Sequence, residues 1–156
     1  MYEPIRTKSV HTMAAAPEIP HRSREQELDI RLAGQLTALL TVTDELHARA
    51  LRAGDREAGQ LDAASLADAA DRIAGQVARL SGGHYPLRAE PTDGAATARV
   101  AALHQRAHTL AGNALAVATT RNDTAAMALT AERMAAHTVP VRDLAPAPAH
   151  RDLASA

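Results

Sequence analysis

Residues 23–54, SREQELDIRLAGQLTALLTVTDELHARALRAG, contain the strongest structural signal in this chain of 156 residues. Aliphatic side chains recur there at the spacing of one helix face, namely Leu28, Leu32, Leu39, Val42 and Leu46. Ser23 and Gln26 match the capping box that begins a helix, and Gly54 suits the position just after a helix ends. The segment therefore predicts a long amphipathic helix over about 23–53.

Three further segments show helical periodicity, at about 62–80, 93–120 and 123–138. In the first of them Leu66, Ile73 and Leu80 repeat every seven residues, as in the seam of an antiparallel bundle. The next segment predicts an inward stripe of Val100, Leu103, Ala107, Leu110, Ala114 and Val117. The last one predicts that Met127, Ala131 and Met134 face inward.

Short connections between consecutive helices favour antiparallel neighbours. The sequence therefore predicts an all-α fold, an antiparallel up-down-up-down four-helix bundle over residues 23–139. Residues 1–22 and 140–156 are interrupted by prolines and have no periodicity, so we expect flexible tails there. Met13 is an alternative start within the first tail.

The composition excludes several classes of protein. Aromatic residues are 1% of the chain and about a quarter of it is alanine, which argues against an all-β fold and for a core with few large side chains. There is no cysteine for disulfides or Cys-based metal sites. No apolar run reaches the roughly 18 residues of a membrane span and no signal peptide is evident, so we expect a cytoplasmic protein.

The balance of basic residues indicates an origin rather than a function. The chain has one lysine among its 17 basic residues, and with its abundant alanine it resembles proteins of high-GC bacteria such as actinomycetes. The net charge of −1 argues against general nucleic-acid affinity.

The sequence has none of the common nucleotide-binding, hydrolase or metalloprotease motifs, so we expect a non-enzymatic protein. Small uncharged residues fall on the outer face of the third helix, namely Ala102, Gln105, Thr109, Gly112 and Ala116. Such a face lets another helix approach closely, and Gly34 and Gly75 in the first two helices fit the same idea. The first hypothesis is therefore an interaction module that binds itself or another protein. The alternative is that these small residues only reflect the alanine-rich composition of the chain and have no role in binding.

Three histidines suggest a second hypothesis, a metal- or small-ligand-binding bundle that could be enzymatic. His104 and His108 are four residues apart and share a helix face, and a hairpin turn near Asn122 would bring His137 level with His108. Three imidazoles plus water is a catalytic-zinc composition. A divalent metal is therefore the one cofactor that the sequence suggests. The alternative is that these side chains lie on the flanks of the bundle.

A third hypothesis concerns arginines in the third helix. No acidic residue occurs between Asp93 and Asp123, whereas Arg99, Arg106 and Arg121 do, which could form a basic stripe for nucleic acid. We prefer the alternative that these arginines pair with acids of neighbouring helices, because they lack aromatic side chains on which bases could stack.

Overall fold

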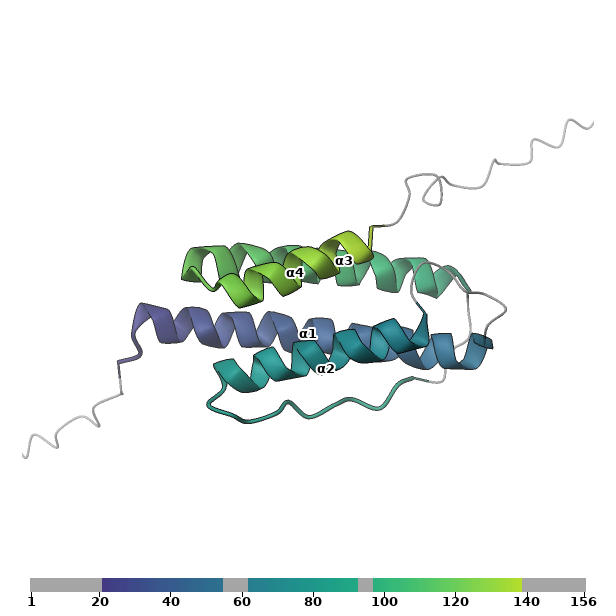
Figure 1. Cartoon of the computed structure of the whole chain (residues 1–156), viewed down its shortest axis with the longest axis horizontal. Helices are drawn as coiled ribbons and strands as arrows, with labels where there is room; N and C mark the ends of the chain where they lie inside the picture. Colours follow the sequence, from purple (N-terminus) through teal and green to yellow (C-terminus); the bar gives the residue numbers. More distant parts are fainter. Residues whose placement is uncertain (1–20, 55–61, 93–96, 139–156) are drawn as a thin grey trace, which may run out of the picture.

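The computed structural model of this chain describes residues 21–54, 62–92 and 97–138. Within these stretches the secondary structure is entirely helical, with four helices packed against each other (Figure 1). They are α1 (Arg24–Ala53), α2 (Ala63–Leu80), α3 (Thr97–Arg121) and α4 (Thr124–Ala136). The predicted all-α four-helix bundle is confirmed. The predicted tails lie outside the described residues, except for residues 21 and 22 of the first tail. Met13 lies outside them as well.

Capping side chains set the helix boundaries where the sequence predicted them. The Ser23 hydroxyl accepts from the Gln26 backbone N–H at 3.1 Å, and the Gln26 side chain accepts from the Ser23 N–H at 3.0 Å. Asp123 begins α4 by accepting from the Ala126 N–H. Asn122 reverses the chain between α3 and α4 with a φ of 58°, a left-handed conformation that asparagine tolerates.

The helix directions differ from the expected up-down-up-down order. Arg121 at the end of α3 contacts Asp29 near the start of α1, so these two helices are antiparallel. Because α2 is also antiparallel to α1, α2 and α3 run in the same direction and α4 runs in that of α1 (Figure 1). α1 packs against α2 and α3, and α3 packs against α4, whereas α2 and α4 touch only lightly.

The reason for this order is the connection after α2, which runs back along the bundle (Figure 1). Gly82 and Gly83 end α2 with positive φ angles of 66° and 93°, and residues 84–92 then have no regular secondary structure. Arg88 in this segment donates to Asp44 of α1 at 2.9 Å and to Asp71 of α2 at 3.2 Å. The crossover segment 81–92 is thereby tied to the first two helices.

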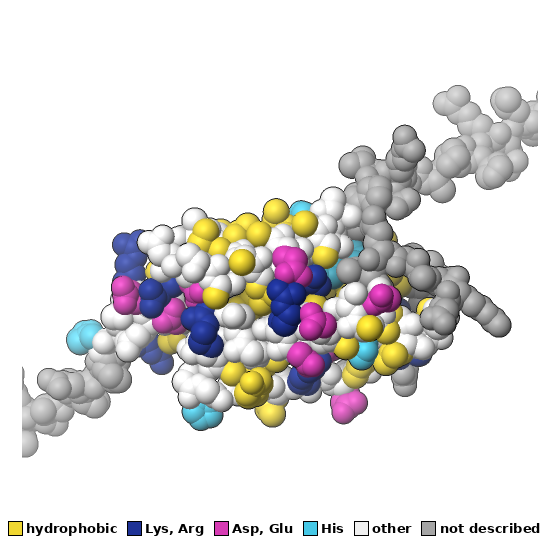
Figure 2. Space-filling model, in the orientation of Figure 1, with side chains coloured by type: hydrophobic (Ala, Val, Ile, Leu, Met, Phe, Trp, Pro, Cys, Tyr) yellow, Lys and Arg dark blue, Asp and Glu magenta, His cyan; other side chains and the backbone are white. Residues whose placement is uncertain are grey.

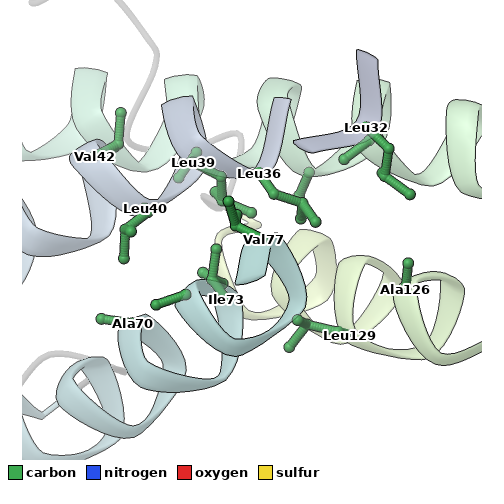
Figure 3. Packing of buried hydrophobic residues seen from close by; sticks show 14 of the residues in the cluster. Leu32, Leu36, Leu39, Leu40, Val42, Ala70, Ile73, Val77, Ala126 and Leu129 are labelled. Carbon is green, nitrogen blue, oxygen red and sulfur yellow. The ribbon is translucent and has the colours of Figure 1, made fainter. Parts of the chain in front are cut away.

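Leucines of α1 provide most of the bulk of the core (Figure 3). Leu32, Leu36 and Leu39 are fully buried, and Ile73 and Val77 of α2 pack into the same cluster.

α3 matches the predicted stripe in part, because Ala107 and Ala114 are buried as expected, whereas Ala111 and Ala118 are buried without having been predicted. Its fully buried residues are all alanines, Ala107, Ala111, Ala114 and Ala118. The expected larger residues Val100, Leu103, Leu110 and Val117 are only partly buried at the edge of the cluster. Alanine occupies the centre because small side chains are what two closely approaching helices can accommodate there.

The inward face of α4 also differs from the expectation. Met127 and Met134 are half-buried, while Ala131 is exposed. The buried residues are instead Ala126, Leu129, Thr130 and Arg133, followed by His137 just after the helix.

Among the described helices, none combines the length and the apolar character that a membrane span requires.

Two glycines do not mark close helix contacts. A Cβ atom built at Gly34 or Gly75 would meet no atom of another part of the described structure within 4 Å. Within the described part of one chain these glycines therefore lie at no close helix contact, and the idea that a partner helix approaches them stays a prediction.

Candidate functional site

Two of the three predicted histidines meet at the boundary between α3 and α4. His104 Nδ1 lies 3.1 Å from His137 Nδ1, and the two ring centroids are 5.3 Å apart. His108, one turn further along α3, directs its Nδ1 to the backbone carbonyl of Met134 at 2.9 Å. Because a carbonyl oxygen only accepts, His108 Nδ1 carries the proton in this contact.

Burial keeps this histidine pair uncharged. His137 is 1% exposed, and burial is the main cause that lowers its pKa to about 4, with smaller contributions from His104, Arg133 and His108. Burial also lowers the pKa of His104. At neutral pH one Nδ1–H of the pair therefore donates to the lone pair of the other.

The arrangement offers a metal ion two imidazoles that face each other rather than three. Within the described residues there is no group of three or more His, Cys, Asp or Glu side chains that could hold a metal ion. The predicted site of His104, His108 and His137 therefore stays a proposal. If a metal bound here, it would replace the proton that His104 and His137 share.

Arg133 is a buried functional group that the sequence interpretation missed. Its side chain is 8% exposed, on the inward face of α4 and one turn before His137. Its Nη2 donates to Glu132 at 2.7 Å, but its Nε and Nη1 have no hydrogen-bond partner. His137 Nε2 is buried without a partner as well. The signal was present, because Arg133 and His137 share the helical spacing of Ala126 and Thr130.

Glu132 links this buried arginine to α2. The Arg72 guanidinium donates to both carboxylate oxygens of Glu132, at 2.9 and 2.6 Å. The hydrogen bonds from Arg72, followed by those from Arg133, lower the pKa of Glu132 to about 2. This carboxylate is therefore ionised at neutral pH and shared between two cations.

The outer face of α3 is largely exposed, as the sequence predicted. Ala102, Gln105, Thr109 and Ala116 are exposed. Gly112 is the exception, because it is half-buried and a Cβ atom there would lie 3.5 Å from the Met134 sulfur of α4. Gly112 therefore belongs to the α3–α4 contact rather than to the outer surface, which corrects its assignment to the outer face.

α4 extends this uncharged surface in a way that the sequence interpretation missed. Ala128, Ala131 and Ala135 are exposed, and Glu132 is the one charged side chain on the exposed part of α4. Figure 2 shows hydrophobic side chains along the edge of the molecule that α4 occupies. We call the exposed residues Ala102, Gln105, Thr109, Ala116, Ala128, Ala131 and Ala135 the α3–α4 outer face.

The three arginines of α3 have different surroundings. Arg121 donates to Asp29 at 2.9 Å and lies 3.9 Å from Glu25, both on α1. The preferred interpretation, pairing between helices, is thus confirmed for Arg121. Arg99 and Arg106 are exposed. Because Arg121 is held by α1, a nucleic-acid surface would depend on the other two, and that hypothesis stays a prediction.

No protein-family model, curated protein or solved structure that was compared with this chain matches it. Its own residues and their geometry are therefore the basis for proposing a function.

Proposed function

We propose that this protein is a non-enzymatic protein–protein interaction module that associates with a second copy of itself through the α3–α4 outer face. The observation that supports this most directly is the exposure of small uncharged residues, among them Thr109, Ala116, Ala128 and Ala131, on two adjacent helices, with Arg106 and Glu132 as their exposed charged neighbours. The exposed surface of a helical protein ordinarily carries charges of both signs. A surface of small uncharged residues lets a partner helix approach closely.

The composition of the core gives this association an energetic reason. Alanine buries little apolar area, and four alanines form the buried ridge of α3. A folded chain with a modest core gains stability when a second molecule binds its native state. Covering the α3–α4 outer face would bury further apolar area where the core itself has little.

The test is the mass of the full chain in solution, measured by sedimentation equilibrium over a wide range of concentrations. We expect a mass that is a multiple of the single chain, and a shift to the monomer in Ala116→Arg and Ala131→Arg. Thr41→Arg is the matched control, because Thr41 is exposed on α1. A wild-type monomer at every concentration, or variants that associate like the wild type, would contradict the proposal.

Gly112 is not suitable for this test. A Cβ atom at this position would already be in van der Waals contact with the Met134 sulfur, so a long side chain would have to displace Met134 and disturb the α3–α4 contact within one molecule. Loss of association in such a variant would not distinguish a broken interface from a broken fold. Ala116 and Ala131 avoid this because their side chains point into solvent.

A second candidate function, metal binding, is favoured by the distance between His104 and His137. Two nitrogens bound to one tetrahedral zinc ion at 2.0–2.1 Å would lie about 3.4 Å apart, close to the observed Nδ1–Nδ1 distance of 3.1 Å. Loading with Co²⁺ tests this, since tetrahedral nitrogen ligation gives visible absorption. We expect one ion per chain, lost in His137→Ala and retained in His84→Ala; no uptake by the wild type would overturn this candidate.

A further inference from the structure

The inward face of α4 contains hydrogen-bonding atoms that no residue of the described structure satisfies. Arg133 Nε and Nη1 and His137 Nε2 are all buried without a partner, and the two residues are one helical turn apart. All the nitrogens of the Arg133 guanidinium are hydrogen-bond donors, and none of them can accept. Buried donors that lack an acceptor destabilise a fold, so such groups generally have a partner.

We propose that Arg133 and His137 form a binding site for a small oxyanion, a carboxylate or a phosphate, on the inward face of α4. This site goes beyond the proposed association, because it uses the opposite face of α4 from Ala128 and Ala131. Arginine is well suited to such ligands, since its N–H groups form charge-assisted hydrogen bonds with carboxylate and phosphate oxygens.

The local charges favour an anion over a cation. Arg133 would repel a metal ion, and the one carboxylate that contacts Arg133, that of Glu132, is also bound by Arg72. His137 is buried, His104 is half-buried, and both are uncharged at neutral pH, so they do not supply a negative charge. An incoming oxyanion would accept from Nε or Nη1 of Arg133, which Glu132 leaves unused.

We place the entry of the ion at the contact between α2 and α4. α2 and α4 touch only lightly, and the Arg72–Glu132 pair spans the space between them. Both side chains of this pair are 44% exposed, so the pair lies at the surface above the buried Arg133. A small ion could enter when this pair opens, without separation of the close α1–α3 packing.

The histidine pair specifies which proton arrangement the site requires. A bound oxyanion needs a donor, so His137 Nε2 must carry a proton. His137 Nδ1 is then the acceptor in the 3.1 Å contact, and His104 Nδ1 is the donor. The opposite arrangement would place a lone pair of His137 Nε2 against the anion. The tautomer of His137 is therefore an independent test of the proposal.

The binding experiment uses the full chain at neutral pH with sodium phosphate and sodium acetate at constant ionic strength, and sodium chloride as the reference. We expect a saturable increase in the thermal midpoint with at least one of the two oxyanions. In Arg133→Met the affinity should fall at least tenfold, while Arg106→Met, on the exposed part of α3, should bind like the wild type.

A second measurement covers the case in which Arg133→Met does not fold. Nitrogen-15 NMR of the wild-type protein reports the Arg133 Nε–H and the His137 tautomer directly. We expect the Arg133 signal to shift on titration and His137 to carry its proton on Nε2. Three results would overturn the proposal: no effect beyond chloride, a His137 with its proton on Nδ1, or a long-lived water at Arg133 that the oxyanions do not displace.

Discussion

His104 and His137 face each other across the boundary between α3 and α4, with their Nδ1 atoms 3.1 Å apart. No carboxylate is among the groups that shift the pKa of either ring. If both rings gained a second proton, two positive charges would face each other at close range. His137 is also one turn from the permanently charged Arg133, whose charge contributes to lowering the pKa of His137. The α3–α4 boundary is therefore most stable while these imidazoles are neutral.

This pair predicts a loss of stability in mild acid. The pKa of His137 is about 4 in the folded protein and about 6.5 in the unfolded chain, so the unfolded chain binds more protons between these values. The free energy of unfolding should fall by up to about 3 kcal/mol as the pH is lowered from 6.5 to 4. Urea unfolding at pH 7.0, about 5.5 and about 4.5 measures this.

The matched variants are His137→Gln and His84→Gln, since His84 is exposed outside the helices. The pH dependence between about 6.5 and 4.5 should become shallower in the first variant and stay unchanged in the second. The pH range ends at about 4.5 because below this value Glu132 takes up a proton in the unfolded chain while it stays ionised in the folded protein, where its pKa is about 2, so its contribution to stability also begins to fall. Equal slopes in all three proteins would contradict the prediction.

Gly34 predicts a gain in stability on substitution. It is exposed in the middle of α1, and an added Cβ atom would meet no other element within 4 Å. Gly34→Ala should raise the free energy of unfolding by about 1 kcal/mol, because alanine has the higher helix propensity. Gly82→Ala should lower it by about 1–2 kcal/mol, because the φ of 66° at Gly82 is unfavourable for alanine. Thermal and urea unfolding of both variants measure these changes in the free energy of unfolding. A loss of stability in Gly34→Ala or a gain in Gly82→Ala would contradict the prediction.

The alanine ridge of α3 predicts that a larger side chain is destabilising. Ala111 is fully buried at the centre of the bundle. Ala111→Leu should cost about 1–3 kcal/mol, since its extra methyl groups would force the helices apart. Ala64→Leu, at an exposed position of α2 away from the α3–α4 outer face, serves as the control and should unfold like the wild type. Unchanged stability of Ala111→Leu would show that the ridge is loosely packed.

Arg88 predicts a coupling between the crossover segment and α1. It donates to Asp44, whose side chain is 10% exposed, so Arg88→Met would leave a nearly buried carboxylate without its cation. We expect a loss of about 2 kcal/mol. In a double-mutant cycle with Asp44→Asn the two losses should be clearly less than additive. Additive losses in urea unfolding would mean that the two side chains act separately.

Local sequence signals predicted the helix boundaries well and the helix directions poorly. Ser23, Asp123 and Asn122 act through hydrogen bonds within a few residues, so their patterns are visible in the sequence. Whether residues 81–92 form a short turn or run back along the bundle depends on the contacts of Arg88 with α1 and α2. Those contacts join residues far apart in the sequence, which periodicity does not reveal.

The candidate site likewise has one part that the sequence predicted and one part that it did not. The contact of His104 with His137 follows from helical spacing and a turn at Asn122, and the sequence indicated this neighbourhood. The methionine pattern does not indicate Arg133, because it predicts a different rotation of α4. Two of the three larger apolar residues of α4, Met127 and Met134, are half-buried, so α4 has no stripe strong enough to fix that rotation from the sequence.

The parallel course of α1 and α4 has a mechanical consequence. In an up-down-up-down bundle the first and last helices have their outer ends side by side, so a pulling force peels the helices apart one turn at a time. Here α1 begins at one end of the bundle and α4 points away from that end (Figure 1). A force applied to Arg24 and Ala136 would instead slide the helices past each other along their axes. The whole length of the interhelical contact would then resist together, and this small bundle should rupture in a single step under tension.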